Sequence, residues 1–278
     1  MRTNNSGQTA LIVLAVMAIA MTLGLSVSQR VTEDVKTSHE QSQSDVAFSA
    51  AEAGIEEALR VIKQGGDKPD IDPSDFGVNQ LLVNIQTQGD EATFTYPNSL
   101  QSGQSAVIWL CNHTVDGVFT ETGCYSENSI DIHWQNQSAI EVVYYYNAGG
   151  GNYKIRRFAF DSNDGRRISS GGSLGNGNNF STSDSSGVDG FDDSASLDLA
   201  GGTPLFLVVR SFYGSTKVMV EASSGNLPVQ GQEIISSGSI DLGDTNIISR
   251  KIRVFRSWPI PPDFVFQSVF AGGGVSGG

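Results

Sequence analysis

The chain has 278 residues and a formal net charge of −13. A protein this acidic lacks the bulk electrostatic attraction that draws proteins to nucleic acid, so we expect no nucleic-acid partner. The sequence contains no nucleophile-elbow, zinc-protease, phosphate-loop or dinucleotide motif, and His39, His113 and His133 occur in unrelated contexts. Composition and motifs therefore favour a structural or interaction protein without enzymatic activity and without a catalytic, metal or cofactor site.

The N-terminal segment consists of a polar leader, residues 1–7, and an apolar run, residues 10–27, of 18 residues without a charged side chain. A helix of that length is about 27 Å long, close to the roughly 30 Å hydrocarbon core of a bilayer. Three interpretations fit. The run is a single-span membrane anchor, a secretory signal cleaved after Ser28, or a type IV prepilin signal whose leader is removed while the apolar helix stays on the mature protein.

The helical pattern continues beyond the apolar run. Residues 31–62 contain no proline and a single glycine, Gly54, which predicts one continuous helix over residues 8–63. A polar stretch, residues 36–45, is followed by apolar residues that recur at helical spacing on one side. We expect residues 46–62 to pack on a globular head. The side chains expected to make that contact are Phe48, Ala51, Ile55, Leu59 and Ile62.

Two blocks of sequence resemble the N-terminal region of PilX-like minor pilins and of the minor pseudopilins of type II secretion. They are SGQTALIVL, residues 6–14, and AFSAAEAGIEEAL, residues 47–59. The resemblance implies cleavage by prepilin peptidase between Gly7 and Gln8, on the cytoplasmic face. It also implies that residues 10–30 first anchor the precursor in the membrane and then enter the core of a helical filament. The residues that it places in the filament core are Ala10, Leu11, Ile12, Val13, Leu14, Ala15, Val16, Ile19, Leu23 and Leu25.

Two positions depart from the usual pilin pattern. The first mature residue is Gln8 where most pilins have Phe or Met, and the fifth is Ile12 where most have Glu. A carboxylate among apolar helices is costly unless it is paired, and in pilins its partner is the free N-terminal amine of a neighbouring subunit. A subunit with Ile12 lacks this pairing, which suits a low-copy subunit or one at the filament tip.

The resemblance implies a minor pilin or pseudopilin of a type IV pilus-like filament, with a structural role in assembly or adhesion. Its expected partners are other pilins or pseudopilins, the inner-membrane assembly platform, prepilin peptidase and, before assembly, membrane lipid. The precursor would be a single-pass protein of the cytoplasmic membrane with its head outside, and the assembled subunit would lie in an extracellular or periplasmic filament. The alternatives are a single-span surface adhesin or envelope protein that joins no filament, and a secreted carbohydrate-binding or hydrolytic domain.

The rest of the chain, residues 64–278, is predicted to form a mostly antiparallel, β-rich, extracytoplasmic head, so the expected fold class is α+β. Short runs of β-branched and aromatic residues alternate with turn residues after the glycine pair that follows the helix. Cys111 and Cys124, with twelve residues between them, are expected to form a disulfide, because an anchored head faces an oxidising exterior. Two free thiols are the alternative.

Residues 161–203 differ in composition from the rest of the head. Thirty of these 43 residues are Gly, Ser, Asp or Asn, which predicts a long, flexible, solvated loop or a linker between two β subdomains. Loop carboxylates are also what Ca²⁺ binds, so calcium is an alternative. The segment DSNDG, residues 161–165, has its glycine one place too early for an EF-hand, and we therefore expect a solvated loop. The carboxylates concerned are Asp161, Asp164, Asp184, Asp189, Asp192 and Asp193.

Overall fold

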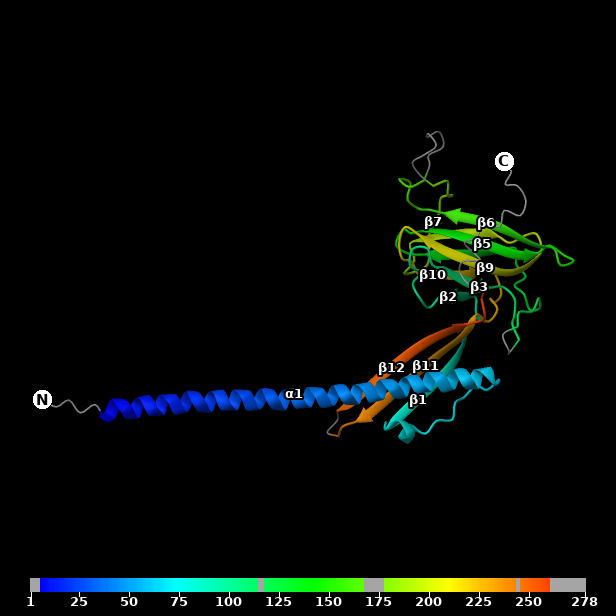
Figure 1. Ribbon diagram of the computed structural model, residues 1–278. Coiled ribbons are helices and arrows are strands. Elements are labelled where there is room, and N and C mark those ends of the chain that lie inside the picture. Colours follow the sequence, from blue (N-terminus) through cyan, green and yellow to red (C-terminus); the bar gives the residue numbers. More distant parts are fainter. Residues whose placement is uncertain (1–5, 115–117, 168–177, 244–245, 261–278) are drawn as a thin grey trace. The chain divides into compact units, whose positions relative to one another are not determined.

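A computed structural model describes residues 6–114, 118–167, 178–243 and 246–260 of the chain. It shows one long helix, α1 (Ser6–Lys63), a short 3-10 helix, η1 (Pro73–Phe76), and then β strands (Figure 1). The strand pairs whose register is resolved are antiparallel. The expected α+β class and the expected continuous helix are both confirmed.

The chain forms two compact units that are discontinuous in sequence. The first comprises Met1–Val61, Asp67–Asn84 and Ile235–Arg253. The second comprises Ile62–Gly66, Ile85–Ile234 and Val254–Gly278. The single head predicted for residues 64–278 is therefore divided, because residues 67–84 and 235–253 belong to the same unit as the helix.

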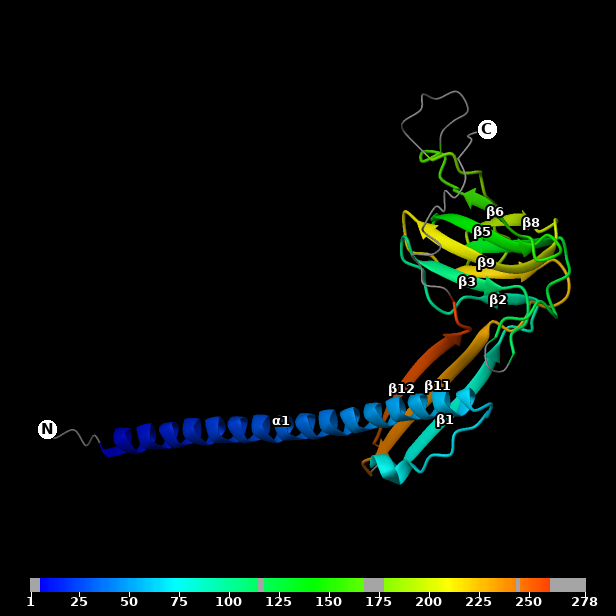
Figure 2. The same cartoon turned by 45° about the vertical axis from the view of Figure 1, so that its right-hand side comes forward.

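In the first unit the C-terminal part of α1 lies against a sheet with the strand order β1-β11-β12 (Figures 1 and 2). These strands are β1 (Gln80–Gln88), β11 (Gly231–Asp241) and β12 (Ile247–Ser257). Ala47 and Ala50 of the helix form a buried cluster with Val78 and Ile240. Arg250 of β12 also donates a hydrogen bond to the Ser44 hydroxyl, with an Nε–Oγ distance of 2.7 Å.

The buried face of α1 is made mostly of small residues: Ala47, Ala50, Ala51, Gly54, Ile55, Ala58 and Ile62. Of the five residues predicted for this face, Ala51, Ile55 and Ile62 are buried and Leu59 is half-buried. Phe48 is 45% exposed, so its predicted place in the packing face is wrong. The pattern of large apolar residues misled because the helix turns its alanines, rather than its largest side chain, toward the sheet.

The helix and β11 approach each other closely at two glycines. A Cβ atom added to Gly54 of α1 would collide with the Ser236 side chain and lie 2.9 Å from Cγ2 of Val83. A Cβ added to Gly238 of β11 would collide with the carbonyl oxygen of Ala47. Each small side chain buries little apolar area, so the contact depends on close van der Waals packing along the whole face.

The second unit contains two sheets. The five-stranded sheet has the order β2-β10-β4-β8-β7 and the four-stranded sheet the order β3-β9-β5-β6. The strands of the first are β2 (Thr93–Thr95), β10 (Val218–Ala222), β4 (Ser129–Trp134), β8 (Asp193–Asp198) and β7 (Asp184–Ser185). Those of the second are β3 (Ser105–Trp109), β9 (Thr203–Phe212), β5 (Ala139–Asn147) and β6 (Tyr153–Phe160).

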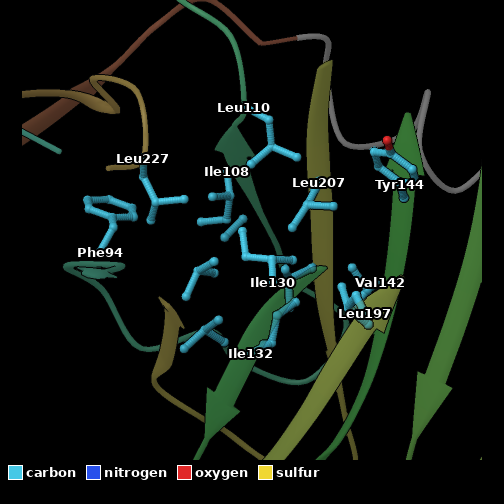
Figure 3. Close-up of a cluster of buried hydrophobic side chains, with 14 of the residues drawn as sticks. Phe94, Ile108, Leu110, Ile130, Ile132, Val142, Tyr144, Leu197, Leu207 and Leu227 are labelled. Atoms are coloured by element: carbon cyan, nitrogen blue, oxygen red, sulfur yellow. The ribbon is translucent and has the colours of Figure 1, made fainter. Parts of the chain in front are cut away.

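The core of this unit is built from alternate residues of both sheets. Figure 3 shows Ile130 and Ile132 of β4 beside Ile108 of β3 and Leu207 of β9. Each of these four side chains is 0% exposed. Because successive strand residues point to opposite faces, this period of two places one apolar set between the two sheets.

Part of the predicted flexible loop is a strand. Within residues 161–203, β8 pairs with β4 over six residue pairs and thus lies inside the five-stranded sheet. The prediction of a long flexible loop is therefore wrong for β8. Ala195 and Leu197 are buried between polar neighbours, and this alternation is easily missed in a segment so rich in serine and aspartate. Residues 168–177 lie outside the described part of the chain.

We predict that Gly54→Ala destabilises the first unit by about 1–3 kcal/mol, because the added methyl group overpacks the contact with β11. Thermal unfolding of the detergent-solubilised protein measures the change. Adding Ser236→Ala should restore part of the loss, since the Ser236 hydroxyl would no longer meet the methyl group and has no hydrogen-bond partner among the described residues.

Gly24→Ala is the matched control, because a Cβ at Gly24 of the same helix meets nothing within 4 Å. It should leave stability unchanged or raise it by up to about 1 kcal/mol through helix propensity. Equal effects of the two alanines would contradict the close-packing account of Gly54.

Candidate functional site

The N-terminal half of α1 is an exposed apolar surface. Large side chains on every side of the helix are roughly half to three-quarters exposed, from Val13 at 48% to Met21 at 72%. By length and composition this helix can cross a membrane. Apolar area of this extent needs lipid or protein around it.

The side chains predicted for a filament core lie on this surface. Val13, Leu14, Ala15, Val16, Ile19, Leu23 and Leu25 are all exposed. Gly7 and Gln8, the predicted cleavage pair, fall within α1, but their side chains and those of Ala10, Leu11 and Ile12 lie outside the described part of the structure.

The predicted disulfide is present. Cys111 and Cys124 are joined in the second unit and close a short loop after β3. Closure of a loop of this size contributes on the order of 3 kcal/mol by restricting the unfolded chain.

A polar cluster follows β6. Asp161 is 0% exposed and receives hydrogen bonds from Arg166 at 2.7 Å and from Asn178 at 2.8 Å. Burial by itself would raise the pKa of Asp161, but the hydrogen bonds from Arg166, Asn178 and the Asn163 amide, with the Arg166 charge, hold it below its usual range. Arg166 also lies 4.9 Å from the ring centroid of Tyr213. The Asp161 carboxylate is therefore already occupied by an ion pair and hydrogen bonds, and the cluster holds the chain together rather than forming a vacant binding site.

Asp193 lies near this cluster, but its pKa is shifted in the opposite direction from that of Asp161. Burial raises the pKa of its carboxyl group, and hydrogen bonds from Ser162 at 3.0 Å and Ser183 at 3.2 Å offset only part of that effect. Asp192 and Asp193 border an open depression of about 530 Å³ whose other lining residues are Asn136, Gln137 and Ser162.

The described residues do not supply the group of carboxylates that a calcium site would need. Within the described residues, no group of three or more His, Cys, Asp or Glu side chains is placed to hold a metal ion. Asp161 is engaged by Arg166 and Asp164 by Arg167, while Asp184 and Asp189 are exposed. The carboxylates that a calcium site in this loop would need are therefore not gathered at one place. Asp161 and Asp164 are in ion pairs, and Asp184 and Asp189 face solvent.

A second polar group connects three distant segments. Nδ1 of His133 on β4 lies 2.9 Å from the Ser186 hydroxyl, and Nε2 lies 3.3 Å from a carboxylate oxygen of Glu221 on β10. The Glu221 contact has ion-pair distance without hydrogen-bond geometry. The Ser186 hydroxyl also accepts the Val188 amide at 3.2 Å, which suits fastening of the loop after β7 rather than attack on a substrate. No sequence motif joins these residues.

His113 packs among aromatic rings. Its ring stacks on Trp258 with centroids 5.1 Å apart and meets Trp109 edge-on at 4.3 Å. Neither ring nitrogen has a hydrogen-bond partner among the described residues. Burial lowers the pKa of His113 to about 4, so the folded protein holds the ring neutral at physiological pH.

No known family model matches the chain, and comparisons with curated proteins and with solved structures find no match. The most distinctive feature is the two-part helix, with an exposed apolar half and a half packed through small residues.

We predict that His113 makes stability depend on pH between about 6.5 and 4. The unfolded chain binds a proton on this ring below about pH 6.5, whereas the folded chain does so only near pH 4, so stability falls as pH falls through this window. The loss should be roughly 1–3 kcal/mol, measured by denaturant unfolding from pH 7 to pH 4.

His113→Phe should remove this part of the pH dependence, whereas His39→Phe, at an exposed position on α1, should retain it. The same pH profile in wild type and His113→Phe would contradict the assignment.

We predict that Arg166→Met destabilises the second unit by about 2–4 kcal/mol, because it leaves the Asp161 carboxylate buried without its charged partner. The free energy of unfolding at pH 7 is the measurement. Arg167→Met, which removes an ion pair to the 88% exposed Asp164, is the control and should cost less than about 1 kcal/mol. A cost as small at Arg166 would show that the pair contributes little.

Proposed function

We propose that this protein is a minor pilin or pseudopilin, a non-enzymatic subunit of a type IV pilus-like filament. The observation that carries the proposal is the unbroken helix Ser6–Lys63, 58 residues long. One end is apolar and exposed, and the other is fastened to a sheet by alanines and Gly54. A rod of this length extends about 87 Å, far more than a bilayer requires.

The continuity of the helix favours a filament over a plain anchor. An anchor needs a helix only to the membrane surface and tolerates a flexible linker beyond it. Here residues 31–45 stay helical although most of their side chains are exposed, and the helix enters its packed section without a break. Rigid coupling between the apolar half and the β structure is useful where subunits stack through their helices and must hold their β regions at defined positions.

In this proposal prepilin peptidase cleaves between Gly7 and Gln8, and residues 10–30 lie in membrane lipid before assembly. The head is outside the cytoplasmic membrane, and the partners are other pilins or pseudopilins and the assembly platform. The aliphatic Ile12 cannot pair with a neighbour's terminal amine as a carboxylate would, which fits a low-copy or tip subunit.

The alternative is a single-span adhesin or envelope protein that joins no filament. The same exposed apolar half of α1 supports it, because lipid alone can cover that surface. It differs from the proposal in predicting an unprocessed N-terminus and residence in the membrane alone.

The test is mass spectrometry of the N-terminal peptide from membranes and, separately, from sheared surface filaments. A peptide beginning at Gln8 in the sheared fraction supports processing and filament membership. A peptide beginning at Met1 and confined to membranes supports the anchored alternative. A start at Gln29 indicates a cleaved secretory signal and refutes both.

We predict that Ala15→Glu abolishes incorporation into filaments, because an unpaired carboxylate in an apolar helix bundle costs several kcal/mol. Immunoblotting of sheared filaments and membranes measures the distribution. Gln41→Glu, which adds the same charge at an exposed position of the polar section, should assemble normally. Normal filaments that contain the Ala15→Glu subunit would refute the core-packing role.

A further inference from the structure

An open groove of the second unit lies beside the free edge of β2. It has a volume of about 540 Å³ and is lined by residues 86–89 at the end of β1, by Glu91 and by β2 itself. Ligand pockets have volumes of roughly 300–1,000 Å³. Glu91, Thr93 and Thr95 are exposed, so the groove is large enough for a ligand and its walls are accessible.

β2 is an edge strand of the five-stranded sheet, and one side of its backbone is open. The Tyr96 amide donates a hydrogen bond to the Val218 carbonyl at 2.9 Å, and Phe94 pairs with β10 in the same phase. Successive residues of a strand direct their amide and carbonyl groups to opposite edges, so Thr93 and Thr95 point away from β10. Among the described residues, these two have no backbone hydrogen-bond partner. They present two amide donors and two carbonyl acceptors on the edge that borders the groove.

This edge lacks the charged side chains that commonly guard an edge strand against pairing. β6, at the edge of the four-stranded sheet, carries Lys154, Arg156 and Arg157. β2 instead carries two threonines and a buried phenylalanine, which are residues that favour strand structure. An extended peptide can therefore pair with β2 through main-chain hydrogen bonds.

Carboxylates surround the same edge. Glu221 on β10 lies opposite Thr93, and Asp131 on β4 lies opposite Glu221, on the sheet face away from the core. Glu91 lines the groove two residues before Thr93. Glu91 and Asp131 have no ion pair among the described residues, and Glu221 lies 3.3 Å from the His133 ring. Lys or Arg side chains on an added strand would complement these charges.

We propose that the free edge of β2 binds a basic, extended segment of a partner protein as an added strand. The backbone of that segment hydrogen-bonds to Thr93 and Thr95, and its Lys or Arg side chains lie near Glu91 and Glu221. Main-chain hydrogen bonds supply affinity, and the carboxylates select a basic sequence. The interaction does not depend on the filament proposal, because it uses only residues of the second unit.

A peptide probe tests the proposal on the full-length, detergent-solubilised protein. The probe is fluorescein-labelled KVKVK with blocked ends, and its control is the same peptide with every backbone amide N-methylated. Both carry the same charge, but the methylated peptide has no amide donor for strand pairing. Fluorescence anisotropy should show at least about fivefold tighter binding of the unmodified peptide, the effect of one net hydrogen bond or more. Equal affinities, or no binding of either peptide, would overturn the proposal.

Two substitutions at one position locate the site. Thr93→Pro removes an amide that points away from β10, so it spares the native strand pairing, and it should weaken probe binding at least about fivefold. Thr93→Val keeps the amide and the branched side chain, and as the matched control it should leave the affinity nearly unchanged. Equal affinities of these two variants would contradict pairing at this edge.

Hydrogen exchange of the wild-type protein covers the case in which Thr93→Pro disturbs folding. The unmodified probe should slow amide exchange in the segment spanning residues 92–96, and the N-methylated probe should not. Unchanged exchange there, or protection at β6 instead, would reject β2 as the binding edge.

Discussion

The close contact between α1 and β11 is the constraint on which the first unit depends. Gly54 and Gly238 leave no room for a Cβ on either backbone, and alanines line the rest of the helix face. Small residues here do what they do between membrane helices: they bring two backbones together so that many weak dispersion contacts add up. The contact fixes the C-terminal part of the helix on its own sheet, while the N-terminal half remains exposed.

The same close packing explains why residues 47–59, AFSAAEAGIEEAL, are rich in small side chains, whereas the apolar run of residues 10–27 is under no such limit on side-chain size. Any set of aliphatic residues can satisfy lipid or a helix bundle, but only residues without bulk can occupy the positions that face Ser236 and Gly238. Phe48 lies within this block yet is 45% exposed, so it is available for a contact outside the monomer. The block therefore encodes a packed face and an exposed aromatic residue on the same two turns.

In the second unit, stability comes from an apolar sandwich core, a disulfide and a few buried polar ties. Asp161 with Arg166, and His133 with Ser186, fasten segments whose composition resembles a disordered linker. These contacts help to order a serine- and aspartate-rich part of the chain, because the buried Asp161 carboxylate and Nδ1 of His133 each have a partner.

The sequence by itself determined the long helix, the α+β class and the pairing of Cys111 with Cys124, because each depends on local pattern or on a choice among very few partners. Tertiary structure alone decided which face of the helix is buried, the strand at residues 193–198, and the apolar cluster of Val107, Trp109, Val143 and Val208. Phe48 and Ala47 are adjacent in sequence, and only the sheet determines which of them is buried. Val107 and Val208 are about 100 positions apart in the sequence, and the antiparallel pairing of β3 with β9 places them side by side. Local periodicity carries no information about such partners, since register and packing between distant segments are settled when the whole chain folds.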